Sequence, residues 1–254
     1  MNQFRGLVTK DWTIIKGYVL LALLLDIIVP LASVTLFPLE SFEERIVVAG
    51  TFMAMHMFLP LVLLSILFSK ELERPDIYFH SSASIHKINA SKLCTVIFST
   101  AISLFWISVL AFAFLLFTPD VTDVTNLFVF GVVFAVGILF FSVQIAIIYY
   151  FYMALFYTMK PKIGGFAYIV TFGLFIFGLE MWDRFKATDF FTTVTDFWIV
   201  PLNESEFLTN IAHGLMVPFE TPATLQIGQF AVITMLLAFL YLVSAYWFEK
   251  KVRA

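Results

Sequence analysis

The stretch LFVFGVVFAVGILFFSVQIAIIYYFYMALFYTM, Leu127 to Met159, contains no charged residue. A helix needs about 20 apolar residues to cross the ~30 Å hydrocarbon layer of a membrane, and this stretch is longer than that. The whole chain has the same character, since 61% of its 254 residues are hydrophobic and only 13% are charged. Soluble globular domains do not have this composition. The sequence therefore predicts an integral membrane protein.

Apolar runs long enough to cross a membrane recur along the chain. Six can be delimited: Tyr18 to Phe37, Ile46 to Phe68, Leu93 to Phe117, Leu127 to Met159, Ile163 to Met181 and Leu225 to Phe248. We predict an all-α integral membrane protein in which residues 1–254 form a single domain with six transmembrane helices. Six crossings place both termini on one side. The fourth run is too long for a straight crossing, so we expect it to tilt or to project from the membrane.

Lysine and arginine are divided unevenly between the two sides of this topology. Basic residues that flank membrane spans are retained in the cytoplasm. One side has twelve of them: Arg5, Lys10, Lys16, Lys70, Arg74, Lys87, Lys92, Lys160, Lys162, Lys250, Lys251 and Arg253. The other side has three: Arg45, Arg184 and Lys186. Both termini are therefore predicted to be cytoplasmic.

The first seventeen residues, MNQFRGLVTKDWTIIKG, are amphipathic on a helical wheel. Apolar side chains such as Phe4 and Trp12 fall on one arc, and Lys10 falls on the opposite, basic arc. We predict that residues 1–17 form an interfacial helix that precedes the first span. Asp11 lies within the apolar arc, so we expect it to meet protein rather than lipid. The alternative is a plain basic flank that only fixes orientation.

A polar segment, residues 69–92, separates the second and third runs on the predicted cytoplasmic side. Pro75 should end the preceding helix, and Asp76 can cap a new short one. Exposed aromatic residues among polar ones are typical of a docking surface for a partner protein. The candidate partner-binding residues are Asp76, Ile77, Tyr78, Phe79, His80, Ser81 and Ser82. The alternative is an ordinary interfacial loop whose aromatic rings dip into the headgroups.

A second polar segment, residues 182–224, is predicted to lie outside the cell. Helical spacing of apolar residues follows Ser205 and stops at Pro218. The alternative to the role that the family resemblance below implies for this spacing is a surface helix that lies flat in the headgroups. Three polar residues inside the spans are candidates for the lining of a path or for helix packing: Asp26, His56 and Gln144. Asp26 is costly in hydrocarbon, so it should face protein or water.

His56 stands among methionines in FMAMHMF, and thioether and imidazole ligands suit copper(I). Residues two apart do not share a helix face, so we predict no metal site and favour a packing or cavity-lining histidine. Glu43, Glu44 and His56 also suggest an intramembrane metalloprotease. That pattern places a basic residue four positions after the second glutamate, where this chain has Val48. We therefore predict no catalytic residue and keep the protease as a remote alternative.

The order of these parts resembles the six-span permease subunits of type-2 ABC exporters. The likeness covers the whole chain and includes the loose pattern of a glutamate after the second span, Glu71 or Glu73, and a basic residue that opens the third, Lys92. It implies a coupling helix in the loop 69–92, short re-entrant helices in 182–224 and a location in the bacterial plasma membrane. It also implies a second permease copy or a paralogue as a partner.

The chain has no GxxxxGK[ST] phosphate loop, so ATP would be handled elsewhere. The resemblance implies a separate ABC ATPase subunit that binds ATP and Mg, with no cofactor in this chain and no nucleic acid partner. Apolar spans favour a hydrophobic or amphipathic substrate, such as a peptide toxin or an antimicrobial peptide. A permease that confers immunity to bacteriocins or lantibiotics is the alternative that the sequence leaves open.

Overall fold

The structure is a computed structural model that describes residues 3–36, 41–72, 83–116, 124–196, 199–201 and 224–252. The candidate partner-binding residues 76–82 lie outside these ranges, as does most of the segment 182–224. The chain divides into two compact units. The described residues of unit 1 fall within Met1–Ala146, and those of unit 2 within Ile147–Glu204 and Glu220–Ala254.

The described part of the chain is almost entirely helical. Six of its helical segments are long and apolar enough to cross a membrane: Gln3–Ala32, Glu44–Glu71, Ile85–Leu116, Leu127–Ile163, Phe166–Lys186 and Gly228–Lys250. The prediction of six spans is confirmed on this criterion of length and composition. The chain is therefore a multi-pass membrane protein by the character of its helices.

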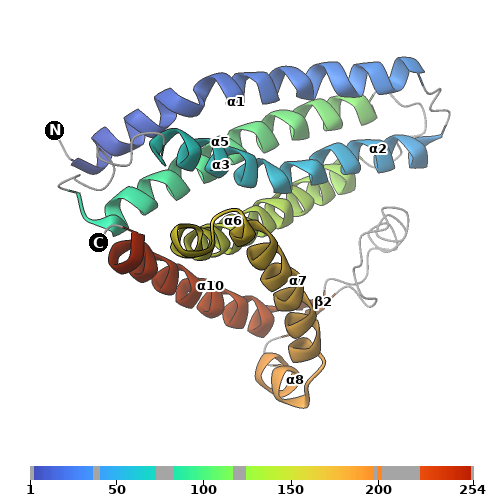
Figure 1. The fold of residues 1–254 in the computed structure, drawn as a ribbon. Helices are drawn as coiled ribbons and strands as arrows, with labels where there is room; N and C mark the ends of the chain where they lie inside the picture. Colours follow the sequence, from blue (N-terminus) through green and yellow to red (C-terminus); the bar gives the residue numbers. More distant parts are fainter. Residues whose placement is uncertain are drawn as a thin grey trace. The chain divides into compact units, whose positions relative to one another are not determined.

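Unit 1 contains α1 (Gln3–Leu36), α2 (Phe42–Met55), a 3-10 turn η1 (His56–Phe58), α3 (Leu59–Leu72), α5 (Ile85–Leu116) and the first part of α6 (Val124–Ile163). In Figure 1, α1, α5 and the pair α2 and α3 lie side by side with their axes roughly aligned. The first helix packs chiefly against α5. These helices bring together residues that are far apart in the sequence.

The helix α1 is continuous from Gln3 to Leu36, whereas the sequence predicted an interfacial helix over residues 1–17 and a separate span from Tyr18. Only Gly17 marks that predicted boundary, and a single glycine inside a helix costs about 1 kcal/mol without ending it. A helix of this length measures ~51 Å, which exceeds the ~30 Å hydrocarbon layer. An end of α1 therefore extends beyond the apolar layer, and its interfacial location remains a prediction.

The second predicted span is not one helix but two, joined by η1. Pro60 lacks the N–H that would donate to the carbonyl of His56, so the regular ladder is interrupted there. The N–H of Leu59 donates to that carbonyl instead. The helix α2 begins with a capping box, in which Ser41 Oγ accepts from Glu44 N at 3.1 Å and Glu44 Oε2 accepts from Ser41 N at 3.2 Å.

Helices enter the polar segment 69–92 from both ends. The helix α3 continues to Leu72, and α5 begins at Ile85, eight residues before the predicted start of the third span at Leu93. Ser84 caps α5, because its carbonyl and hydroxyl oxygens accept from Lys87 N at 3.0 and 3.4 Å. The part of this segment between α3 and α5 is thus shorter than the sequence suggested.

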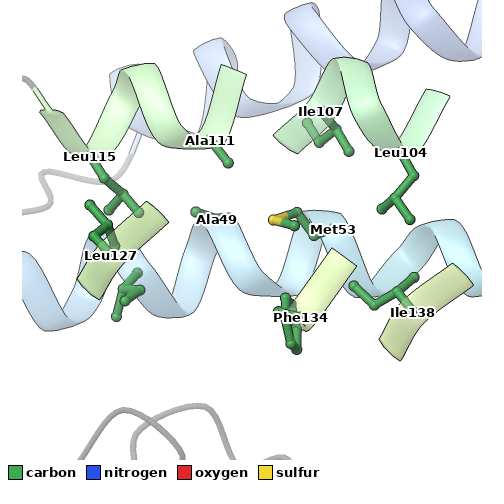
Figure 2. Packing of buried hydrophobic residues seen from close by; sticks show 10 residues of the cluster. Ala49, Met53, Leu104, Ile107, Ala111, Leu115, Leu127, Phe134 and Ile138 are labelled. Carbon is green, nitrogen blue, oxygen red and sulfur yellow. The ribbon is translucent and has the colours of Figure 1, made fainter. Parts of the chain in front are cut away.

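The apolar core of unit 1 lies between α2, α5 and α6. Figure 2 shows Ala49 and Met53 of α2 facing Leu104, Ile107, Ala111 and Leu115 of α5, with Leu127, Phe134 and Ile138 of α6 nearby. All of these side chains are buried. The rings of Phe112 and Phe128 join α5 to α6 edge to face, with centroids 5.8 Å apart.

Unit 2 contains the rest of α6, α7 (Phe166–Lys186), α8 (Asp189–Thr195), the short strands β1 (Ile199–Pro201) and β2 (Thr224–Gln226), α10 (Ile227–Trp247) and a π-helical turn η2 (Phe248–Val252). The two strands pair antiparallel. Gly164 separates α6 from α7 at φ 57°, a conformation that glycine adopts without strain. The stacked rings of Tyr150 and Phe248, with centroids 5.4 Å apart, pack α6 against the start of η2.

Candidate functional site

A group of charged and polar residues joins three helices at one end of unit 1. We call it the charged cluster: Lys10 and Asp11 of α1, Glu71 of α3, and Ser91 and Lys92 of α5. Asp11 falls on the one buried face of α1, which continues through Ile15 and Val19. Glu71 lies in the last turn of α3, and Lys92 lies two turns after the start of α5.

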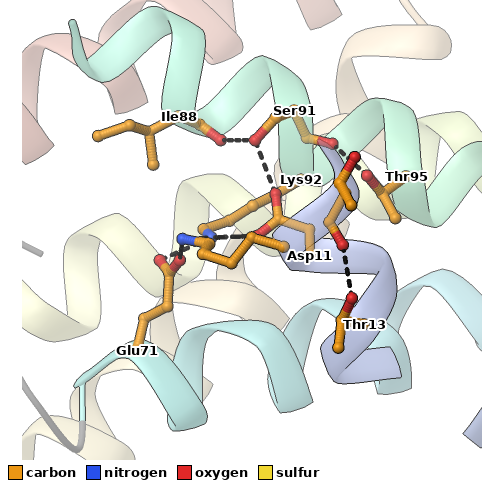
Figure 3. A network of polar contacts seen from close by, with 9 residues as sticks. Asp11, Thr13, Glu71, Ile88, Ser91, Lys92 and Thr95 are labelled. Atoms are coloured by element: carbon orange, nitrogen blue, oxygen red, sulfur yellow. Dashed lines mark hydrogen bonds and ion pairs between the residues drawn. The ribbon is translucent and has the colours of Figure 1, made fainter. Parts of the chain in front are cut away.

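The Asp11 carboxylate is held from α5 by two groups. Ser91 Oγ donates to Asp11 Oδ2 at 2.7 Å, and Lys92 Nζ lies 3.4 Å from Asp11 Oδ1. The same ammonium lies 2.6 Å from Glu71 Oε2. Lys10 Nζ contacts Glu71 Oε1 and lies 3.7 Å from Asp11 Oδ1. Figure 3 shows Asp11, Glu71, Ser91 and Lys92 converging from their three helices.

The charged cluster combines two carboxylates with two ammonium groups, so its formal charge is zero. The side chains of Asp11, Lys92 and Glu71 are 0%, 1% and 7% exposed, whereas that of Lys10 is 47% exposed. A fully buried lysine is rare and needs anionic partners, because the lost hydration of the ammonium group is costly. Lys92 has two such partners, and its ammonium also lies 5.8 Å from the centre of the Phe68 ring.

The position of the charged cluster in the chain is as important as its geometry. Glu71 and Lys92 stand on either side of the segment 73–82, which lies outside the described residues. Both are bound to α1 through Asp11 and Lys10. The two helices that lead into and out of this segment are thereby fixed to each other and to α1.

A second group lies further along the same helices. We call it the embedded polar cluster: Asp26 of α1, His56 of η1 and Ser103 of α5. His56 Nε2 lies 3.0 Å from Asp26 Oδ1, and Ser103 Oγ donates to Asp26 Oδ2 at 3.0 Å. The other ring nitrogen of His56, Nδ1, lies 2.9 Å from the carbonyl oxygen of Phe52. All three cluster side chains belong to buried residues.

Proton counting constrains the embedded polar cluster. Both nitrogens of His56 face an oxygen atom, and a neutral imidazole carries only one N–H. The carbonyl of Phe52 can only accept, so Nδ1 carries a proton. The contact between Nε2 and Asp26 then holds one further proton, either on the ring beside a carboxylate or on the carboxyl beside a neutral ring. In both cases the pair is neutral overall, which suits a position among apolar helices.

A line of hydroxyl side chains on α5 runs between the two clusters. Ser91, Thr95, Ser99 and Ser103 recur every four residues and are all buried. Thr95 and Ser99 donate to the carbonyls one turn earlier, each at 2.7 Å. Small side chains of this kind let two helices approach closely. The contacts of Asp11 with Ser91 and of Asp26 with Ser103 also show that α1 and α5 run parallel.

The structure brings together only some of the residues that the sequence singled out. Asp26 and His56, treated separately above, form one cluster, and Lys10 and Asp11 belong to another. Trp12 is exposed at 36%, and Gln144 is half-buried on α6 and belongs to neither cluster. Sequence reasoning missed Ser91 and Ser103, because a serine gives no signal of its partner, whether it lies in the polar segment 69–92, as Ser91 does, or in an apolar run, as Ser103 does.

Residues that could hold a metal ion do not gather in the described ranges, where no group of three or more His, Cys, Asp or Glu side chains is found. Near His56, Met53 is buried and Met55 is 60% exposed, so the two thioethers do not share a face. Glu44 is engaged in the capping box of α2. These positions give no support to a copper site or to a metalloprotease.

Compared with known protein families, with curated proteins and with solved structures, the chain has no match.

Proposed function

We propose that this protein is the membrane-spanning subunit of an ATP-driven exporter of the type-2 ABC class, with both termini in the cytoplasm of a bacterial cell. The observation that carries the proposal is the charged cluster. It ties the two ends of the segment 73–82 to α1 through Glu71 and Lys92. A permease of this class needs such a rigid connection, because we expect the ATPase to act on the membrane helices through this cytoplasmic loop.

The physical reason lies in how the two ends are held. A loop between independent helices would move without displacing either of them. Here Lys92 Nζ lies 2.6 Å from Glu71 Oε2, so a push on the loop acts on α3 and α5 together. Lys10 and Asp11 extend the connection to α1. Three helices would thus respond as one body to a partner docked at residues 76–82.

ATP and Mg belong to the partner in this proposal, since the chain has no phosphate loop. The partner is an ABC ATPase subunit, and a second permease copy or a paralogue completes the transporter. The many exposed apolar side chains of α1, α6 and α7 provide surface for lipid and for that second permease. A hydrophobic or amphipathic substrate, such as a peptide toxin or an antimicrobial peptide, fits spans of this composition best.

The decisive experiment removes the two aromatic rings that we expect to anchor the ATPase. Tyr78→Ala with Phe79→Ala should leave the protein folded and membrane-inserted, yet abolish its co-purification with a vanadate-sensitive ATPase from its native membranes. Central aromatic anchors contribute on the order of 2 kcal/mol or more to an interface. The matched control is Tyr18→Ala with Phe98→Ala, because those rings are 45% and 64% exposed on α1 and α5.

Two outcomes contradict the proposal. One is the absence of ATPase activity from the purified wild-type complex. The other is a Tyr78→Ala, Phe79→Ala protein that retains its ATPase as well as the control does, which would show that coupling runs elsewhere.

A further inference from the structure

Unit 1 contains an apolar groove of about 410 Å³ between α2, α5 and the first part of α6. Its walls include Ala49 and Met53 of α2, Leu104 and Ala111 of α5, and Gly131 and Phe134 of α6. Its volume falls in the range of about 300–1,000 Å³ that is usual for ligand sites. Figure 2 shows several of these side chains around the space.

Small residues on all three helices create the groove. Ala49, Ala111 and Gly131 each take a lining position where a larger side chain would fill it. A Cβ atom added at Gly131 meets no atom within 4 Å, so close packing does not require glycine there. The missing side chain leaves open space rather than allowing two backbones to approach.

The groove offers a ligand almost no hydrogen bonds. Among the lining residues that the structure describes, only Ser108 has a polar side chain, and that hydroxyl already donates to the carbonyl of Leu104 at 2.6 Å. Water inside would lack the two to four polar partners that hold a buried water. An empty groove would lose the dispersion contacts of its walls. The natural filling is therefore hydrocarbon.

The rim of the groove opens between exposed apolar side chains. Phe105, Phe128 and Val136 line it and are 71%, 56% and 63% exposed. On helices that span a membrane, such side chains face acyl chains. From Leu127 to Leu139 the groove follows α6 for ~18 Å, which is close to the depth of one leaflet of a ~30 Å apolar layer. The groove thus has the length and the opening of a site for one acyl chain.

A cationic residue, Arg45, is the sequence neighbour of Ile46, which lines the same end of the groove as Leu115. Arg45 precedes Ile46 in α2, and its guanidinium lies 5.7 Å from the centre of the Phe114 ring. Guanidinium groups bind phosphate in a bidentate manner. This end therefore suits the headgroup of a phospholipid whose chain enters the groove.

We propose that the groove between α2, α5 and α6 is a specific site for an anionic phospholipid, with one acyl chain against Gly131 and the headgroup phosphate at Arg45. The site depends on insertion into a membrane and not on an ATPase partner. The proposal of a lipid site can therefore be wrong while the proposed export function is right, and the reverse also holds.

The test uses the full chain reconstituted in phosphatidylcholine nanodiscs that contain phosphatidylglycerol with a photoreactive group in its acyl chain. Cross-links mapped by mass spectrometry should concentrate on groove residues such as Leu104 and Phe134. Gly131→Leu fills the groove and should lower this labelling by about threefold or more, since lipid sites in a bilayer depend on shape rather than on hydrophobic transfer. Gly137→Leu is the matched control, because it lies on α6 outside the groove and its Cβ also meets no atom within 4 Å.

Two further variants keep the test decisive. Gly131→Ala adds only a Cβ, so it reports a smaller decrease if the leucine variant does not fold. Arg45→Gln should remove the preference for phosphatidylglycerol over phosphatidylcholine while acyl labelling of the groove persists.

The proposal is overturned if Gly131→Leu and Gly137→Leu are labelled alike, or if labels spread evenly over the exposed faces of α1 and α6. It is also overturned if a photoreactive amphipathic peptide labels the groove and the lipid does not, because the groove would then be a cargo site.

Discussion

The charged cluster and the embedded polar cluster both join α1 to α5, but the first contains four full charges and the second only a carboxyl, an imidazole and a hydroxyl. The first lies at the helix ends, where Lys10 is still 47% exposed. The second lies about 22 Å further along α1, because fifteen residues separate Asp11 from Asp26 and each adds about 1.5 Å. The full charges thus lie near the helix ends, where water is close, whereas Asp26 and His56 further along the helices share one proton and are neutral as a pair.

This difference has an energetic consequence. Removing one member of a buried ion-pair network leaves an uncompensated charge and costs about 3–5 kcal/mol. Side-chain hydrogen bonds between membrane helices average only about 0.6 kcal/mol, with a maximum near 1.7. We therefore expect the charged cluster to determine whether α1, α3 and α5 pack together. The embedded polar cluster should add a smaller contribution to the stability of that packing.

The comparison assumes that the charged cluster faces the cytoplasm, and cysteine labelling tests this with an all-or-none result. In a Cys94→Ser background, an impermeant thiol reagent should label His86→Cys only from inside and Thr125→Cys only from outside. Both positions are exposed, and they lie near the start of α5 and of α6. Labelling of both from the same side would contradict the six-span topology.

The largest energetic effect is expected from Lys92→Met. It removes the buried ammonium and leaves Asp11 and Glu71 with Lys10 as their one remaining cation within the described cluster. The midpoint of thermal unfolding in detergent should fall by an amount that corresponds to about 3–5 kcal/mol.

Two comparisons separate charge from packing at this site. Lys87→Met removes an exposed ammonium that donates to Gln3 Oε1 and should change stability little. Adding Asp11→Asn to Lys92→Met restores neutrality and should recover part of the loss. A Lys92→Met protein as stable as Lys87→Met would show that the charged cluster does not hold the three helices.

Asp26→Asn should have a smaller effect, of about 1 kcal/mol. The amide keeps an oxygen for Ser103, and its N–H can donate to Nε2 of a neutral His56, so the contact survives without the shared proton. Membrane insertion should be normal, and assembly or transport should change. Unfolding midpoints and transport rates measure this, with the exposed Asp183→Asn as control, whose side chain is 72% exposed. A loss of stability as large as that of Lys92→Met would show that the two clusters contribute equally to the packing of the helices, contrary to this expectation.

Much of the fold follows from the sequence, because apolar runs of sufficient length have few alternatives. The run starting at Leu127 lies within one helix, α6, whereas the run starting at Ile46 is divided between α2 and α3 by η1. The boundaries follow less well. Gly17 did not separate the predicted interfacial helix from the first span, because one glycine is a weak signal against a continuous ladder of hydrogen bonds. The break at η1 comes from Pro60, which the apolar run around it concealed.

The two clusters were harder to predict from the sequence than the membrane spans. Asp11 was conspicuous because a carboxylate stood in an apolar arc, yet its partner Lys92 lies 81 residues away, and no local pattern connects them. Asp26 and His56 were each noticeable as polar residues among apolar ones. Their contact depends on how α1 packs against η1, which is a property of the folded chain. The sequence thus indicated which side chains need partners but not which partners they find.

The smallest effect is expected from Lys10→Gln, and it shows whether exposure or charge sets the energies within the charged cluster. Lys10 contacts Glu71 as Lys92 does, but water screens its 47% exposed side chain, so the expected loss is only about 0.5 kcal/mol. Screening lengths shrink from about 8 Å at 0.15 M salt to about 3 Å at 1 M. The wild-type protein should therefore lose a similar amount of stability at 1 M salt, whereas Lys10→Gln should be insensitive to salt. Unfolding midpoints at both salt concentrations test this, and equal salt sensitivity of the two proteins would mean that the exposed ammonium contributes nothing.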